Sequence, residues 1–376
     1  MINAAFESNF AERGEVGASL SVWRGEEEAV SLHSGFADRK QTRPWTDDTI
    51  AVVYSVTKGL SAACVLLALH EEGYALDEPV SNLWPQIKGS TFQQLLSHQA
   101  GLAALDDWAK VEDYEAVIAS IEAQTRSPNW TVGAKHGYHA RTFGFLLDEI
   151  VRRLTNAENL GVFWRERIAD PMNLDFWMGL PPSEDHRVAQ LQAGKGESAG
   201  GELSKFYKAF NDKDSLTRRV FSSPRGLHSV SQMNEAENWR LCLPAMGGIG
   251  SARSIAKFYA MMANGGTWNG QRILPEEVID QAQQLLVDGN DQILLTNSAF
   301  SAGFMKDPLD GNGAKLRQLF GPSTQAFGHP GAGGSLAFAD PENGIAFAYI
   351  MNQMELSLLP TEKALGLVRA VYEEFV

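Results

Sequence analysis

The most constraining feature of the sequence is a serine and a lysine three residues apart at the expected start of a buried helix. Ser55 and Lys58 stand in the run Tyr-Ser-Val-Thr-Lys, and residues 59–70 behind them are small or apolar and contain no proline. This pattern predicts a buried helix with Ser55 at or near its N-terminus, where free backbone N–H groups favour negative charge. Residues three apart share a helix face, so we expect the Lys58 amine within reach of the Ser55 hydroxyl. A hydroxyl becomes a good nucleophile when a neighbouring base takes its proton, and a desolvated lysine can be that base.

A second Ser-x-x-Lys spacing occurs at Ser254 and Lys257. Residues 251–264 around it have the pattern of an ordinary amphipathic helix, with Ser251 as its N-terminal cap. We therefore interpret this second pair as structural.

A rival nucleophile motif, Gly-x-Ser-x-Gly, spans residues 196–200 around Ser198. In α/β-hydrolases this motif needs a buried apolar strand before it and a buried helix after it. The flanking residues here are too polar for either element, so we favour Ser55 over Ser198 as the nucleophile.

Composition excludes several classes of protein. The 376 residues are 44% hydrophobic, which is enough for one large domain or two closely associated ones. The formal net charge is −14 and no basic run occurs, so neither nucleic acid nor an anionic membrane is expected as a partner. No apolar stretch of about 18 residues is present to cross a membrane. Without an N-terminal signal segment, we expect a cytoplasmic protein if Met1 is the native start. Oligomeric state is not predicted.

Cofactor and metal sites are not expected either. Cys64 falls within the apolar run behind Ser55, which predicts a buried thiol instead of a disulfide. His136 and His139 lie close together but lack a third ligand at a suitable spacing for zinc.

The expected elements suggest one sheet built from both ends of the chain. Helices are expected at 3–13, 59–72, 91–98, 112–124, 143–154, 158–168, 251–264, 275–286 and 360–375, and strands at 16–23, 29–36, 300–304, 325–329, 335–339 and 344–352. Residues 181–235 are expected to form loops and short helices. This order predicts an α/β (α+β) fold, with an antiparallel sheet flanked by the terminal helices and an inserted all-helical domain. We expect a sheet domain of residues 1–58 and 245–376, a helical domain of residues 59–244, and the active site between them.

Three short motifs follow one another along the chain. They are Ser55-Val-Thr-Lys58, then Tyr138 in Gly-Tyr-His-Ala, then His329-Pro-Gly331 followed by Ala-Gly-Gly-Ser. In this order they resemble the class C β-lactamase family, and more closely its esterase relatives, the family VIII carboxylesterases. The resemblance spans nearly the whole chain and implies the serine β-lactamase/DD-peptidase-like fold.

The resemblance also implies acyl transfer and assigns roles to residues. Ser55 would attack a carbonyl and form an acyl-enzyme, and Lys58 would accept or relay its proton. Tyr138 would be the second base and would protonate the leaving group, with its pKa lowered by Lys58. The backbone N–H groups of Ser55 and Ala332 would form the oxyanion hole. The remaining expected substrate-binding residues are His329, Gly331, His139 and Trp130.

Two departures from the family pattern bear on the substrate. Ala140 stands where the family has an asparagine that helps hold the substrate amide in β-lactamases, and His329-Pro-Gly331 replaces a Lys-Thr-Gly motif. A histidine is largely neutral near pH 7 at its ordinary pKa of about 6.5, so it attracts a β-lactam carboxylate less than a lysine does.

We therefore predict a serine carboxylesterase that hydrolyses small neutral esters. The alternatives are a β-lactamase or a D-amino-acid peptidase or amidase with the same nucleophile, an acyltransferase, and a non-catalytic binding protein. The intact set of Ser55, Lys58 and Tyr138 argues against the binding protein.

Overall fold

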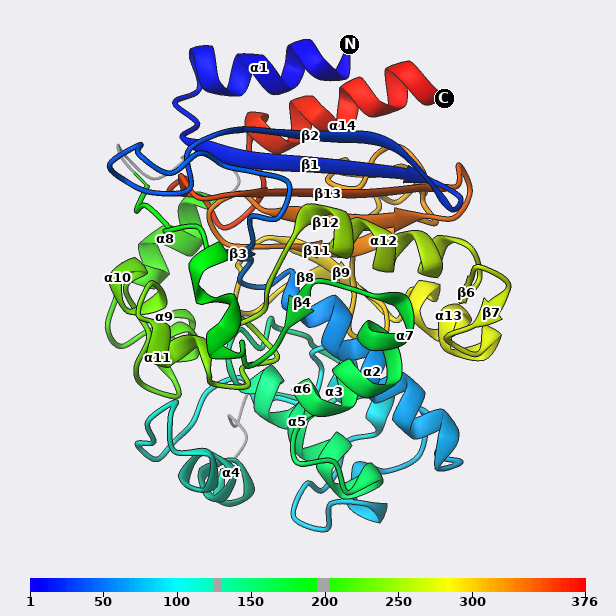
Figure 1. Ribbon diagram of the computed structural model, residues 1–376. Helices are drawn as coiled ribbons and strands as arrows, with labels where there is room; N and C mark the ends of the chain where they lie inside the picture. The colour runs from blue at the N-terminus through cyan, green and yellow to red at the C-terminus, as the bar shows by residue number, and fades with distance from the viewer. Residues whose placement is uncertain (125–129, 195–202) are drawn as a thin grey trace.

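An eight-stranded antiparallel sheet organises the computed structural model, which describes residues 1–124, 130–194 and 203–376 (Figure 1). The strand order is β2-β1-β13-β12-β11-β10-β9-β8, so the first strand of the chain pairs with both β2 and the last strand, β13. Leu20 of β1 faces Tyr349 of β13, for example. The strands are β1 (Gly17–Arg24), β2 (Glu27–Gly35), β8 (Val287–Asn290), β9 (Asn297–Phe300), β10 (Met305–Lys306), β11 (Phe327–Pro330), β12 (Leu336–Asp340) and β13 (Ile345–Met351).

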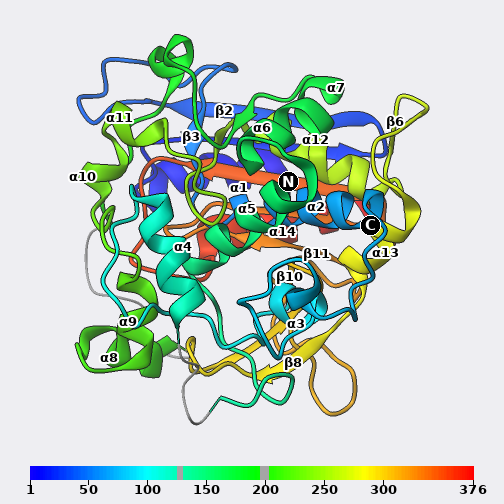
Figure 2. The ribbon, with the colours of Figure 1, turned by 90° about the horizontal axis from the view of Figure 1, so that it is seen from below.

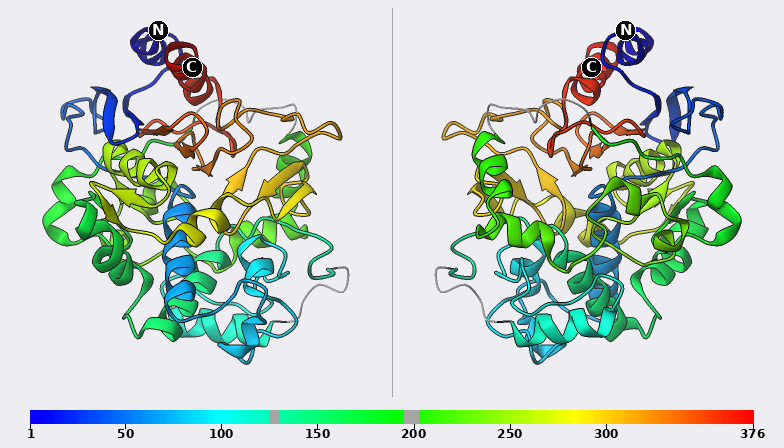
Figure 3. Two further views of the ribbon diagram at one scale, coloured as in Figure 1. Left: turned by 90° about the vertical axis from the view of Figure 1, so that its right-hand side faces the viewer. Right: turned by 90° about the vertical axis from the view of Figure 1, so that its left-hand side faces the viewer.

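Helices cover both faces of this sheet. The terminal helices α1 (Ile2–Glu12) and α14 (Glu362–Phe375) lie side by side on one face (Figures 1 and 3). Helix α12 (Ala252–Ala263) packs against β1, β12 and β13 on the other face. The sequence-based prediction of an antiparallel sheet flanked by the terminal helices is confirmed.

The middle of the chain is mainly helical and lies on the α12 side of the sheet (Figures 1 and 2). Its helices are α2 (Thr57–Glu71), α3 (Phe92–Leu96), α4 (Tyr114–Ala123), α5 (Thr142–Thr155), α6 (Leu160–Trp164), α7 (Asp170–Met172), α8 (Ser204–Asn211), α9 (Leu216–Ser222), α10 (Val230–Met233) and α11 (Ala236–Trp239), and α13 (Glu276–Gln283) follows α12. A small sheet of order β3 (Ala51–Val52), β5 (Ile249–Gly250) and β4 (Phe176–Trp177) and a hairpin of β6 (Thr267–Trp268) and β7 (Gln271–Arg272) complete the fold. The domain boundaries given above remain a prediction.

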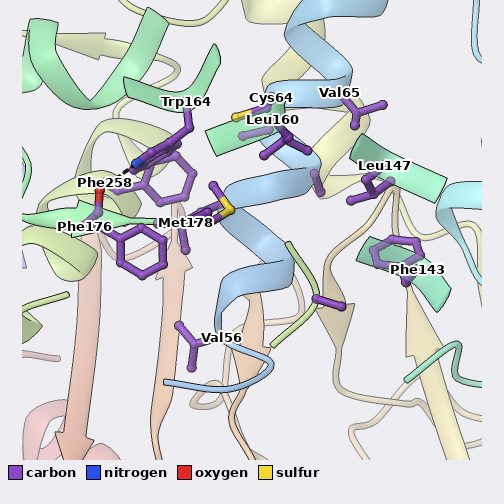
Figure 4. Close-up of a cluster of buried hydrophobic side chains, with 14 of the residues drawn as sticks. Val56, Cys64, Val65, Phe143, Leu147, Leu160, Trp164, Phe176, Met178 and Phe258 are labelled. Carbon is purple, nitrogen blue, oxygen red and sulfur yellow. Dashed lines mark hydrogen bonds between the residues drawn. The ribbon is translucent and has the colours of Figure 1, made fainter. Parts of the chain in front are cut away.

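Helix α2 is the centre of the main hydrophobic core (Figure 4). Every residue from Thr57 to Leu69 is buried, so the helix has almost no solvent face. The side chains packed around it come from α5, α6, β4 and its flanks, and α12; they include Phe143, Leu147, Leu160, Trp164, Phe176, Met178 and Phe258. The predicted buried helix behind Ser55 is thereby confirmed, and its position is fixed from several sides.

Several short elements differ from the expectation. The strand expected at 300–304 is instead the last residue of β9 and the turn that leads to β10, because Ser301 N–H bonds back to the Phe304 carbonyl. Strand β8 was not predicted, because its sequence Val-Asp-Gly-Asn lacks apolar alternation. The Gly-x-Ser-x-Gly motif around Ser198 lies outside the described residues.

Within residues 1–124, 130–194 and 203–376, none of the helices combines the length and the apolar composition that a membrane crossing would need.

Trp164 gives a direct test of the packing around α2. Its side chain is fully buried, and its Nε1–H donates to the Phe176 carbonyl at 2.9 Å. Trp164→Ala should lower the free energy of unfolding by about 3–5 kcal/mol, because it leaves a cavity and removes a buried hydrogen bond to the Phe176 carbonyl. Denaturant unfolding would measure this, with Leu316→Ala, at a half-exposed site, as the matched control. Equal losses in the two variants would contradict the core assignment.

Candidate active site

Ser55 lies in a strained turn between β3 and α2. Tyr54 before it has a φ of 46°, a left-handed conformation that is uncommon for an aromatic residue. The Lys58 N–H then donates to the Ser55 carbonyl at 3.0 Å, which begins the first turn of the helix. The turn leaves Ser55 partly exposed at the end of a helix that is otherwise buried.

The Lys58 amine is held against Ser55 inside the protein. Its Nζ lies 3.2 Å from Ser55 Oγ, 2.9 Å from the Ala140 carbonyl oxygen and 2.8 Å from the Ala245 carbonyl oxygen. Lys58 is fully buried, and in the described part of the chain no carboxylate forms an ion pair with it. Burial, and then the nearby charge of Arg141, hold the pKa of Lys58 well below its usual range.

These three contacts match a neutral amine. An uncharged lysine has two N–H donors and one lone pair, whereas the two carbonyl oxygens can only accept and the Ser55 hydroxyl can donate. In the neutral form the two N–H groups donate to Ala140 and Ala245 and leave the lone pair for the serine proton, whereas in the charged form a third N–H donates to Ser55 Oγ. This is the arrangement of a base beside a nucleophile.

Tyr138 is the third member of the cluster. Its hydroxyl hydrogen-bonds to Ser55, and the Lys58 Nζ lies 4.9 Å from the centre of its ring. The expectation that Lys58 lowers the pKa of Tyr138 is wrong in direction: burial raises this pKa, and it outweighs the opposite effect of the Ser55 hydrogen bond. With its pKa raised by burial, Tyr138 is a protonated phenol that can donate.

The backbone of the Tyr138 loop is fixed at three successive amides. Gly137 N–H donates to the His98 carbonyl at 3.0 Å, and His139 N–H donates to His98 Nδ1 at 3.2 Å. Tyr138 N–H lies 3.2 Å from each carboxylate oxygen of Asp291. The loop has no helical or strand hydrogen bonds of its own, so these partners hold it in place. The sequence analysis did not single out Asp291, because no local pattern links it to residue 138.

His139 and Trp130 make contacts that serve the loop itself. The ring of His139 bonds the Gly137 carbonyl through Nδ1 and accepts the Leu102 N–H through Nε2, and burial lowers its pKa to about 4. Trp130 Nε1–H donates to the Gln99 carbonyl at 2.9 Å. The predicted contacts of these two residues with substrate remain predictions.

His329 lies beside the tyrosine. Its ring centre is 5.8 Å from that of Tyr138, its Nδ1 bonds the Pro330 carbonyl at 2.7 Å, and burial lowers its pKa to about 3. Among the described residues, no partner exists for its Nε2. His329 is therefore a neutral imidazole with one free polar atom.

The segment after β11 meets the turn that carries Ser55. A side chain on Gly331 would lie 2.3 Å from the Val53 carbonyl oxygen, so only glycine allows this close approach. Ala332 follows and is partly exposed. Across residues 1–124, 130–194 and 203–376, no acceptor is present for the backbone N–H of either Ser55 or Ala332.

The second Ser-x-x-Lys pair has structural partners. Ser254 Oγ accepts the Asp175 N–H at 2.8 Å, and Lys257 Nζ donates to the Met172 carbonyl at 2.6 Å. In the described part of the chain, no group of three or more His, Cys, Asp or Glu side chains could hold a metal ion.

Comparison with known proteins identifies the family. The family model described as Beta-lactamase matches residues 2–368. The chain is 30% identical over 372 residues to "Esterase/beta-lactamase LipL" of Mycobacterium tuberculosis (strain ATCC 25618 / H37Rv). This match covers 96% of the chain and 82% of LipL. The chain therefore belongs to the Beta-lactamase family.

Two solved structures agree with this assignment. A penicillin-binding protein homologue from Caulobacter crescentus superimposes with a TM-score of 0.86 and 34% identity, covering 99% of this chain and 96% of that one. A family VIII carboxylesterase superimposes with a TM-score of 0.85 and 32% identity over the same shares. The serine β-lactamase-like fold and the resemblance to esterases of this family are confirmed.

Burial of Lys58 predicts a pH-dependent stability. In the unfolded chain the amine keeps a proton up to about pH 10.5, whereas in the folded protein it loses the proton at a lower pH. Between these two pKa values the unfolded state binds more protons, so stability falls as the pH falls. Relative to Lys58→Met, the wild type should lose about 1.4 kcal/mol of unfolding free energy per pH unit through this window.

Urea unfolding of the two proteins from pH 6 to pH 10 measures the difference directly. The groups common to both proteins cancel in this comparison, which isolates Lys58. A difference that does not change with pH would show that the folded lysine stays charged.

Proposed function

We propose that the chain is a serine carboxylesterase that hydrolyses small neutral esters through an acyl-enzyme on Ser55. The observation that carries the proposal is the buried Lys58 amine, 3.2 Å from the Ser55 hydroxyl, whose pKa is held well below its usual range by burial. Family membership supports serine hydrolase chemistry. The names of its relatives, an esterase/β-lactamase and a family VIII carboxylesterase, support the ester substrate.

Acylation follows from the contacts around Ser55. Lys58 takes the hydroxyl proton as Ser55 Oγ bonds to the ester carbonyl carbon. The N–H groups of Ser55 and Ala332 stabilise the resulting oxyanion, a contribution worth roughly 10²–10³ in rate for one such donor. Tyr138 gives its proton to the departing alkoxide, and the protonated Lys58 beside it returns a proton to the phenolate oxygen. Water then attacks the acyl-enzyme by the reverse proton path and releases the carboxylic acid.

The charges around Tyr138 favour an uncharged substrate. His329 and His139 are both neutral at physiological pH, since burial lowers their pKa values to about 3 and about 4. Arg141 is the nearby cation, but its guanidinium donates to the carbonyls of Gly226 and Leu227. A carboxylate on the substrate would therefore enter a buried site with little positive charge to compensate it.

A β-lactam substrate is the second candidate, because LipL carries both activities in its name. The same acyl-enzyme would form on Ser55 when the β-lactam amide bond breaks. Turnover of nitrocefin well above that of a p-nitrophenyl ester would favour this candidate. Hydrolysis of a D-amino-acid peptide or amide, or acyl transfer to an alcohol, would use the same residues and is tested by product analysis.

The nucleophile is tested with two serine variants. Ser55→Ala should lower kcat/KM for p-nitrophenyl butyrate by roughly 10⁴-fold or more, because no group remains to form the acyl-enzyme. Ser254→Ala is the matched control, since Ser254 stands in the other Ser-x-x-Lys pair and only accepts a backbone N–H. It should keep its activity. Full activity in Ser55→Ala, or loss in Ser254→Ala alone, would contradict the proposal.

A further inference from the structure

Asp291 is a buried carboxylate that no step of the proposed reaction uses. It follows β8 directly, in the connection to β9, and it is fully buried. Its Oδ1 accepts the N–H groups of Ile293 and Leu294, both at 2.8 Å, and its Oδ2 accepts the Ser298 hydroxyl at 2.8 Å. An ionised carboxylate is costly to bury, and these donors offset part of that cost. They also fix its orientation within its own hairpin.

The same carboxylate reaches across to the Tyr138 loop. Both of its oxygens lie 3.2 Å from the Tyr138 N–H, although the two residues are 153 positions apart in the chain. The Gln292 N–H donates to the His136 carbonyl at 3.0 Å, and His136 Nε2 lies 2.9 Å from the Ser298 hydroxyl. The hairpin therefore holds the loop at residue 136 and at residue 138.

The hairpin also contacts the tyrosine ring. Phe300, the last residue of β9, lies parallel to the Tyr138 ring, with an interplanar angle of 8° and 6.2 Å between ring centres. The backbone amide and the ring of Tyr138 are thus both set by one hairpin at the edge of the sheet. Neither contact touches the Tyr138 hydroxyl, which stays with Ser55.

We propose that Asp291 is a positioning residue for the general acid: by holding the Tyr138 amide, it aims the phenol at the leaving group. This inference rests on the proposed function, in which Tyr138 protonates the departing alkoxide. A misplacement of about 1 Å can cost up to 10²-fold in rate, so a backbone tether of this kind has a measurable effect.

The chemistry of the leaving group separates this role from a purely structural one. An alkoxide needs a proton as it leaves, whereas p-nitrophenolate is a stable anion and leaves without one. A misaimed Tyr138 therefore slows acylation by an alkyl ester much more than acylation by a p-nitrophenyl ester. A lower fraction of folded protein, by contrast, reduces the measured kcat/KM for the two esters by the same factor.

The test compares kcat/KM for ethyl butyrate and p-nitrophenyl butyrate, which give the same acyl-enzyme. In Asp291→Asn, Oδ1 remains for Ile293 and Leu294, while the new NH₂ group replaces one of the two acceptors of the Tyr138 N–H with a donor that repels it. We expect kcat/KM to fall about 10-fold or more for the ethyl ester and about threefold or less for the p-nitrophenyl ester.

Asp307→Asn is the matched control. Asp307 is also a buried carboxylate that accepts two backbone N–H groups, those of Leu319 and Phe320, but it pairs with Lys315 and does not contact Tyr138. It should leave the ratio of the two rates unchanged. If Asp291→Asn does not fold, Ser298→Ala decides, since it loosens the carboxylate without removing it and should shift the ratio in the same direction.

Tyr138→Phe provides the reference, with a selective loss on the ethyl ester of roughly 10²–10⁴ expected for a lost general acid. If Tyr138→Phe is selective and neither Asp291→Asn nor Ser298→Ala is, the inference about Asp291 is overturned and the proposed function stands. A ratio shift in Asp307→Asn equal to that in Asp291→Asn overturns it as well. If Tyr138→Phe slows both esters equally, the role proposed for Tyr138 fails.

Discussion

The site depends on a buried lysine amine that has no acidic partner among the described residues. Most buried lysines keep their charge by pairing with a carboxylate, but Lys58 contacts two carbonyl oxygens and a serine hydroxyl. Desolvation therefore favours loss of the proton, and in the neutral amine the two carbonyls leave the lone pair to face Ser55. The core around α2 is what enforces this, because every residue of the helix from Thr57 to Leu69 is closed off from water.

The rest of the site follows from the need to assemble separate segments around that amine. Ser55 comes with α2, Tyr138 comes with a loop fixed by His98 and Asp291, and the Gly331 segment comes with β11. The sheet brings these together because it is built from both ends of the chain. The helical segment supplies the loop and the Ala140 carbonyl, and the Ala245 carbonyl comes from the connection between α11 and β5.

The sequence predicted the elements whose signals are local. The apolar run after Ser55 indicated a buried helix, and the β1–β2 hairpin and the strands β11, β12 and β13 followed from alternation and turn residues. The three ordered motifs also carried the family resemblance. What these signals share is that neighbouring residues contain the whole pattern.

The features that were missed depend on contacts between distant residues. Asp291 stands in an unremarkable polar stretch, and its role appears only when the β8–β9 hairpin meets residue 138. The predicted decrease in the Tyr138 pKa was wrong because it required a charged Lys58 beside the tyrosine. Both groups are buried, and burial on this scale depends on the tertiary structure and not on the local sequence. The left-handed Tyr54 likewise has no local signal, since glycine is the residue that usually marks such a conformation.

The central claim, a neutral Lys58 that activates Ser55, is tested most directly by the pH dependence of covalent labelling. Intact-protein mass spectrometry can follow the rate at which a fluorophosphonate reacts with the protein between pH 5 and pH 11, with Ser55→Ala as the blank. The account predicts a rate that is constant at alkaline pH and falls in acid, with a midpoint at the pKa of Lys58, well below 10.5. A rate that keeps rising to about pH 10.4, the ordinary pKa of lysine, would contradict it.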